Sequence, residues 1–258
     1  MISLRAIPVV TFVVAAAVAV HAADLEARSA THLSAAQIQG RELAAEIMSE
    51  SPVTNLSETG ILRIRNSQGT TNIPINFHTG VDGPKWYVIY TATPRNGSAE
   101  NLEIIHQNGR PNEYNSAEEN GTTKAPATGS VHLSRTQLMT PFAGSDFWIA
   151  DLGLQFFHWP EQKVIGRQNR RMRNCTVLES DNPNPSPGAY SKVVAWIDNQ
   201  TLGIIYAEAY DRAGKLLKVF EPKSLKKVNG QWELQDIEIR NVQTHSRTWI
   251  RFNLNGNS

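Results

Sequence analysis

The chain has 258 residues, and its 25 lysines and arginines almost balance its 24 aspartates and glutamates. A formal net charge of only +1 argues against a dedicated nucleic-acid-binding protein. The single cysteine, Cys175, excludes an internal disulfide, so packing has to stabilise the fold.

The first 22 residues have the pattern of a secretory signal peptide. Arg5 provides a basic start, residues 7–20 are apolar except at two positions, and Val20-His21-Ala22 offers a small-residue cleavage pattern. The uninterrupted apolar stretch is shorter than the roughly 20 residues that span a membrane. We predict a cleaved signal peptide at 1–22 and a single domain at 23–258 that works outside the cytoplasm.

One long helix is predicted near the start of this domain. Ser34 and Gln37 have the spacing of a capping box, and Ser51-Pro52 ends the helix. The apolar residues on one helix face are Ile38, Leu43, Ala44 and Ile47. Such a stripe needs a sheet to bury it.

Short alternating segments then recur to the C-terminus, separated by turn dipeptides such as Asn96-Gly97. They predict eleven strands, at 60–65, 71–77, 85–91, 101–107, 163–167, 173–179, 190–197, 202–210, 216–223, 231–242 and 246–254. Side chains alternate along a strand, so Leu62 and Ile64 should lie opposite Arg63 and Arg65. By the same rule, Leu202, Ile204 and Tyr206 should share one face. The pattern predicts a mainly β fold with a few helices, built on a large, strongly curved antiparallel sheet.

Two stretches are irregular. Residues 112–130, rich in Asn, Glu, Gly and Thr, are interpreted as an exposed, mobile loop. Residues 136–160 carry six aromatic residues that need burial, namely Phe142, Phe147, Trp148, Phe156, Phe157 and Trp159. Ser145 and Asp146 are plausible N-caps there, so we expect one or two short helices lying over an open face of the sheet.

No catalytic signature appears in the sequence. There is no nucleophile elbow, no phosphate-binding glycine motif and no ligand spacing typical of zinc. Glu233, Asp236 and Glu238 alternate along a predicted strand, as solvent-facing charges do. We therefore predict a protein that is not an enzyme, with no catalytic residue, metal or cofactor. The basic run at 167–173 is either a solvated hairpin tip or a rim for lipid headgroups or an acidic partner.

Several motifs in the C-terminal half resemble a known family. They are Pro141-Phe142-Ala143-Gly144-Ser145-Asp146-Phe147, Ala150-Asp151-Leu152, Ala195-Trp196-Ile197-Asp198 and Glu208-Ala209-Tyr210-Asp211-Arg212-Ala213-Gly214-Lys215. In this order they resemble the outer-membrane lipoprotein-sorting (LolA-like) family, especially its uncharacterised bacterial branch. The resemblance implies a periplasmic protein with an unclosed β-barrel, capped by helices on its concave face, where acyl chains of a lipoprotein are held.

This resemblance and the alternation together predict a ligand site. The pocket would be lined by Trp86, Val88, Ile104, Trp196, Ile204 and Tyr206. Its lid would consist of Phe147, Trp148, Leu152 and Phe156. Arg63 and Arg65 are candidates for release or headgroup contacts, because the family uses an arginine for release. Ordinary core packing is the alternative for each apolar residue.

Two functions follow from this reading. The first is a periplasmic carrier or binding protein for lipoproteins or other acylated ligands, with an inner-membrane transporter or an outer-membrane acceptor as possible partners. The alternative is an envelope sensor or interaction module that binds a protein partner and transports no lipid.

Overall fold

The computed structural model describes residues 33–52, 55–118, 131–228 and 231–254. The described residues from 36 onward form one compact unit. The predicted signal peptide lies outside the described residues, and the predicted domain boundaries stay a prediction. Within the described ranges, no helix combines the length and apolar character needed to cross a membrane.

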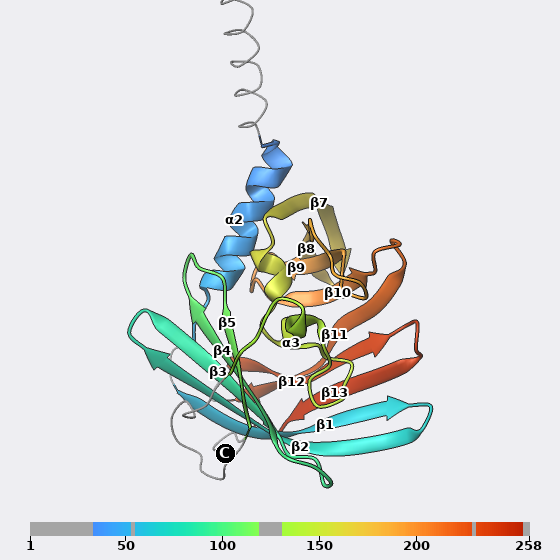
Figure 1. Cartoon of the computed structure of the whole chain (residues 1–258). Coiled ribbons are helices and arrows are strands. Elements are labelled where there is room, and N and C mark those ends of the chain that lie inside the picture. Colours follow the sequence, from blue (N-terminus) through green and yellow to red (C-terminus); the bar gives the residue numbers. More distant parts are fainter. Residues whose placement is uncertain (1–32, 53–54, 119–130, 229–230, 255–258) are drawn as a thin grey trace, which may run out of the picture. The chain divides into compact units, whose positions relative to one another are not determined.

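Thirteen strands of the described residues form one antiparallel sheet. They are β1 (Leu56–Asn66), β2 (Gly69–Asp82), β3 (Lys85–Ala92), β4 (Glu100–Gln107), β5 (Glu113–Glu118), β6 (Val131–His132), β7 (Glu161–Arg170), β8 (Arg173–Asp181), β9 (Lys192–Asp198), β10 (Ile204–Tyr210), β11 (Leu216–Val228), β12 (Gln231–Asn241) and β13 (Ser246–Phe252). Their order is β6-β5-β4-β3-β2-β1-β13-β12-β11-β10-β9-β8-β7. The edge strands β6 and β7 are not paired with each other, so the strongly curved sheet of Figure 1 is not closed into a barrel.

Almost all pairings join strands that follow one another in the chain. The exception is β1 with β13, where Leu62 lies opposite Ile250 and Arg63 lies opposite Trp249. The chain therefore builds outward from β1 to one edge, crosses to the other edge and returns to β1. Residues 133–160 make that crossing.

The helix α2 (Ala35–Ser49) lies where the sequence predicts it. Ala44 and Ile47 are buried, but Ile38 is 44% exposed, so its predicted burial is wrong. Gly40 allows the close approach of α2 to the sheet, because a Cβ there would lie 2.5 Å from the backbone nitrogen of Lys163.

The predicted fold class is confirmed, and all eleven predicted strands are present. The expected loop at 112–130 is wrong in part, because residues 113–118 form β5 and pair with β4. Residues 119–130 lie outside the described part of the chain.

Candidate ligand-binding faces of the sheet

The crossing segment 133–160, which we call the plug, covers the concave face of the sheet, which we call the inner face (Figure 1). It contains three short helical turns, η1 (Gln137–Met139), α3 (Ile149–Leu152) and η2 (Gln155–His158). Its side chains divide between two apolar clusters. Phe142 and Phe147 pack with β1–β5, β12 and β13, whereas Phe156 and Phe157 pack with α2 and β8–β11. The expected short helices over an open sheet face are therefore present.

Asp146 attaches the middle of the plug to β13. Its backbone N–H donates to Thr248 Oγ1 at 2.9 Å. Its carboxylate accepts hydrogen bonds from the hydroxyl groups of Thr248, at 2.9 Å, and Ser246. The expected N-cap roles of Ser145 and Asp146 are wrong, because α3 is capped at Trp148, whose N–H donates to Asp151 Oδ2 at 2.8 Å.

Lys218 of β11 makes a second polar attachment, and it is only 1% exposed. Its Nζ donates to the Asp146 carbonyl at 2.7 Å and lies 3.6 Å from Asp151 Oδ2. The ammonium also lies 3.6 Å from the centroid of the Trp148 ring, which stacks on Tyr190. The Tyr190 hydroxyl donates to the Asp151 carboxylate at 3.0 Å. One lysine thus joins two points of the plug to the inner face.

Burial dominates the electrostatics of this attachment. Desolvation lowers the pKa of Lys218 to about 8, although Asp151 and Asp146 act in the opposite direction. Desolvation likewise raises the pKa of Asp151 against the opposing effect of Lys218. An ion pair so buried adds little net stability. The pair joins α3 of the plug to β11.

Little space remains between the plug and the inner face. A cavity of about 20 Å³ lies beside Lys218, and it is lined by Asp151, Leu154, Phe156, Tyr190, Val193, Ile204, Ala207, Ala209, Phe220 and Ile239. This is room for about one water molecule, so an acyl chain cannot enter it. Around this cavity, side chains of the plug pack against the inner face.

Comparison with known proteins gives a family and a fold for this chain. A protein-family model described as "-like: Uncharacterized protein" matches residues 125–254, just over half of the chain. The chain belongs to this family of uncharacterised proteins. No curated protein is significantly similar to it.

Three solved structures resemble this family member over most of its length. A DUF1329 family protein from Desulfovibrio piger ATCC 29098 is 19% identical, with a TM-score of 0.66 over 87% of this chain and 94% of that chain. A putative outer membrane lipoprotein-sorting protein domain from Vibrio parahaemolyticus is 19% identical, with a TM-score of 0.67 over 84% and 92%. A LolA superfamily protein from Nitrosomonas europaea is 15% identical, with a TM-score of 0.55 over 86% and 93%. Identities this low establish the fold alone, and that fold is LolA-like, as the motifs predict.

In this LolA-like fold, most of the predicted pocket and lid residues meet on the inner face. Trp86, Val88, Ile104, Phe147 and Leu152 belong to the cluster around β1–β5. Trp148, Phe156 and Ile204 belong to the cluster around α2 and β8–β11. In this structure they contact one another as packed core, and their binding of a ligand stays a prediction.

Trp196 and Tyr206 lie elsewhere. They pack edge to face, with ring centroids 5.2 Å apart, in a third cluster with Cys175, Val177 and Val194. This cluster is on the opposite face, because Ala195 and Ile197 of β9 face inward. The prediction that Ile204 and Tyr206 share a face is wrong, since a β-bulge between them shifts the alternation.

Sequence reasoning missed the polar attachments of the plug, which involve Lys218, Asp146 and Asp151. Asp146 and Asp151 stand in the quoted motifs, but their partners are far away in sequence. Lys218 carries a visible signal, because it is a charged residue inside the apolar run from Leu216 to Phe220. Alternation places it on the face of Phe220, which is an unusual position for a lysine.

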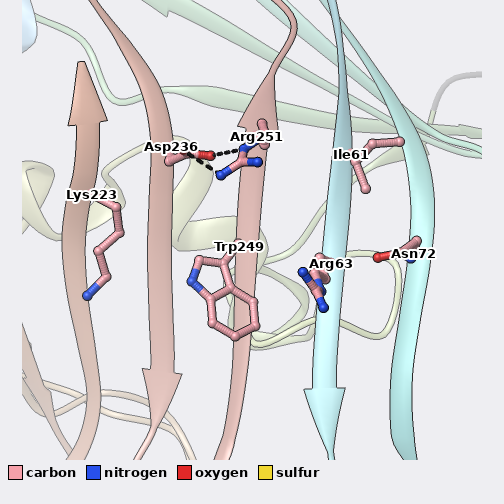
Figure 2. A pocket seen from close by; sticks show the side chains of 7 residues that line it. All are labelled: Ile61, Arg63, Asn72, Lys223, Asp236, Trp249 and Arg251. Atoms are coloured by element: carbon pink, nitrogen blue, oxygen red, sulfur yellow. Dashed lines mark hydrogen bonds and ion pairs between the residues drawn. The ribbon is translucent and has the colours of Figure 1, made fainter. Parts of the chain in front are cut away.

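The convex face, which we call the outer face, carries a groove of about 400 Å³ (Figure 2). It is lined by Ile61, Arg63, Asn72, Lys223, Asp236, Trp249 and Arg251. Arg63 and Arg65 lie on this face, because Leu62 and Ile64, which alternate with them along β1, point inward. Neither side chain therefore reaches the inner face, where the proposed acyl ligand would be held and released.

Asp236 and Glu238 are also on the outer face, but they are not the solvent-facing charges that the sequence predicts. Both are buried beneath basic side chains. Arg251 Nε donates to Asp236 Oδ1 at 2.6 Å, and Lys223 Nζ lies 3.2 Å from Glu238 Oε1. Each carboxylate is thus held in an ion pair.

Proposed function

We propose that this protein is a periplasmic carrier or binding protein for lipoproteins or other acylated ligands, with the inner face as its pocket. In the proposal, residues 1–22 are a signal peptide, and an inner-membrane transporter or an outer-membrane acceptor hands over or receives the ligand. Binding needs no catalytic residue, metal or cofactor. The fold supports the proposal, because a LolA-like curved sheet with an apolar inner face can exclude water from an acyl chain. Each methylene buried there contributes about 0.8 kcal/mol.

The observation that carries the proposal is how the plug is held. A permanent core segment is held best by apolar packing, and a buried ion pair can often be replaced by apolar residues without loss of stability. Here Asp146, Asp151 and Lys218 place polar attachments between two apolar clusters. In the proposal these attachments break and re-form as a unit, so that the plug leaves the inner face when an acyl ligand enters.

The test locks the plug in place. In the variant Asp146→Cys/Ser246→Cys, the two substituted side chains are in contact in the wild-type protein, so oxidation should join the plug to β13. We expect wild-type protein purified from its own envelope to carry an acylated species in native mass spectrometry with lipid extraction. The reduced variant should take up an offered triacylated lipopeptide, and the oxidised variant should not.

The single variant Ser246→Cys controls for the loss of the serine hydroxyl. Phe156→Glu places a charge under the plug and should abolish retention of the lipopeptide. An apo mass for the wild-type protein together with no uptake by the reduced variant would overturn the carrier proposal.

The packing of the plug against the inner face favours a second candidate, an envelope sensor or interaction module. The sheet of such a module would serve as a scaffold and hold no lipid. A cavity of only about 20 Å³ is consistent with that role. The same experiment separates the two candidates, since a sensor would stay apo in both redox states.

A further inference from the structure

We propose that the outer-face groove binds an acidic, extended segment of a partner protein, with Trp249 at its centre. This inference goes beyond the carrier function and does not depend on it. The groove crosses five neighbouring strands, from Asn72 on β2 to Lys223 on β11. Four spacings of about 4.8 Å make it roughly 19 Å long, which matches about six residues of extended chain.

Trp249 lies between basic side chains. Figure 2 shows its indole between Lys223 and Arg63. The guanidinium carbon of Arg63 is 5.9 Å from the ring centroid, and that of Arg247 is 5.5 Å from it. Tryptophan and arginine are among the residues most enriched at binding hot spots.

On the outer face, basic side chains lie closer to solvent than acidic ones. Where a basic and an acidic side chain pair, the basic one is the more exposed. The side chains of Arg251 and Asp236 are 67% and 11% exposed, and those of Arg240 and Glu238 are 43% and 5% exposed. A partner approaching from solvent therefore meets positive charge, although the whole chain is nearly neutral.

Three arginines also lie side by side in the sheet. Arg65 is directly opposite Arg247 on β13, and Arg247 is directly opposite Arg240 on β12. Like charges directly opposite one another destabilise a sheet. Among the described residues, Arg63, Arg65 and Arg247 form no ion pair with a carboxylate. They are available to carboxylates of another molecule.

The shape of the groove favours a protein segment over a membrane surface. Trp249 is half-buried, whereas Arg63, Arg247 and Arg251 around it are exposed. A flat bilayer would reach the arginine ends but not the indole, whereas an extended segment can enter the groove and contact both. Because the groove and the plug lie on opposite faces, the partner and an acyl ligand do not compete for space.

The test uses a fluorescent hexapeptide of alternating glutamate and valine, with a glutamine-for-glutamate peptide as its control. Fluorescence anisotropy should show binding of the acidic peptide alone, weakening as salt is added. The variant Arg63→Gln/Arg247→Gln should raise its Kd by about tenfold. Arg110→Gln, an exposed arginine in the β4–β5 turn, should change the Kd by less than about twofold.

Trp249→Ala should also weaken binding, and circular dichroism of each variant shows whether it is folded. No binding of the acidic peptide, or equal binding by Arg63→Gln/Arg247→Gln and Arg110→Gln, would overturn the proposal. The last part of the test measures binding to vesicles of phosphatidylglycerol and phosphatidylcholine. Arginine-dependent binding to them without peptide binding would assign the face to a membrane surface and overturn the peptide site.

Discussion

Lys218 of β11 and Asp151 of the plug meet where the plug packs on the inner face, with Nζ 3.6 Å from Oδ2 and with side chains that are 2% and 10% exposed. Two ionisable groups thus face each other where water hardly reaches. Replacing both with apolar groups and removing only one have very different consequences, because a lone buried charge has no compensation.

Lys218→Met is therefore expected to destabilise the protein by about 3 kcal/mol, since it leaves the Asp151 carboxylate unpaired. Lys218→Met/Asp151→Asn should recover part of this loss, because the amide is neutral and still able to accept from Trp148 and Tyr190. Urea unfolding of the wild type, the two single variants and the double variant gives the coupling energy. Additive losses would mean that the two side chains do not interact.

His106 predicts a loss of stability in acid. Its ring is buried on the inner face and stacks on Trp86 at 3.7 Å, and its Nδ1 has no hydrogen-bond partner. Burial, with a smaller contribution from His158, lowers the pKa of His106 to about 4. The unfolded chain binds this proton from about pH 6.5 downward and the folded chain does not, so stability falls as the pH falls through that window.

The expected loss attributable to His106 is about 2 kcal/mol between pH 7 and pH 5. His106→Phe keeps an aromatic ring against Trp86 and removes the titrating group. Urea unfolding of both proteins at the two pH values should show a shallower dependence for His106→Phe. Equal dependence in the two proteins would contradict the assignment.

Alanine substitutions at two glycines test how closely α2 packs on the sheet, one as the test and the other as its control. Gly40→Ala places a Cβ within 2.6 Å of the Gln162 and Lys163 backbone and should destabilise the protein by about 1–3 kcal/mol. Gly166→Ala on β7 meets nothing within 4 Å and should be neutral or slightly stabilising. Thermal unfolding compares them directly, and similar melting temperatures would mean that α2 is not seated as described.

Arg170 has a packing role that neither reading of the basic run at 167–173 includes. Its guanidinium carbon lies 3.4 Å from the Tyr206 ring centroid and 4.8 Å from that of Trp196. It therefore covers the third apolar cluster, and Arg170→Ala should lose about 1–2 kcal/mol. Arg167→Ala, which is exposed on the same strand, should change the free energy of unfolding by less than about 0.5 kcal/mol. A free energy unchanged by Arg170→Ala would favour a simple solvated tip.

The elements of the fold were predictable because their signals are local. Alternation and turn dipeptides mark eleven strands, and a capping pattern marks α2. The strand β5 has no such signal, because Glu113-Tyr114-Asn115-Ser116 offers one typical strand residue among polar ones near the sheet edge.

The site was less predictable, because its partners are distant in sequence. The Asp146 carbonyl and Lys218 Nζ meet across 72 residues, and nothing local to either residue indicates the other. The bulge in β10 moves Ile205 and Tyr206 together against the third cluster, and period-two alternation cannot reveal it. Eight of ten predicted pocket and lid residues nevertheless share the inner face, since apolar periodicity identifies the buried side.

The single pairing of β1 with β13 has a consequence for how the chain folds. Every other pairing forms between successive strands, so each half of the sheet can grow by adding hairpins one at a time. The junction between β1 and β13 requires the two ends of the domain to find each other, and closing so long a loop is slow. We expect two stacks of hairpins to form early and to be joined last along this one seam, with the plug enclosed between them.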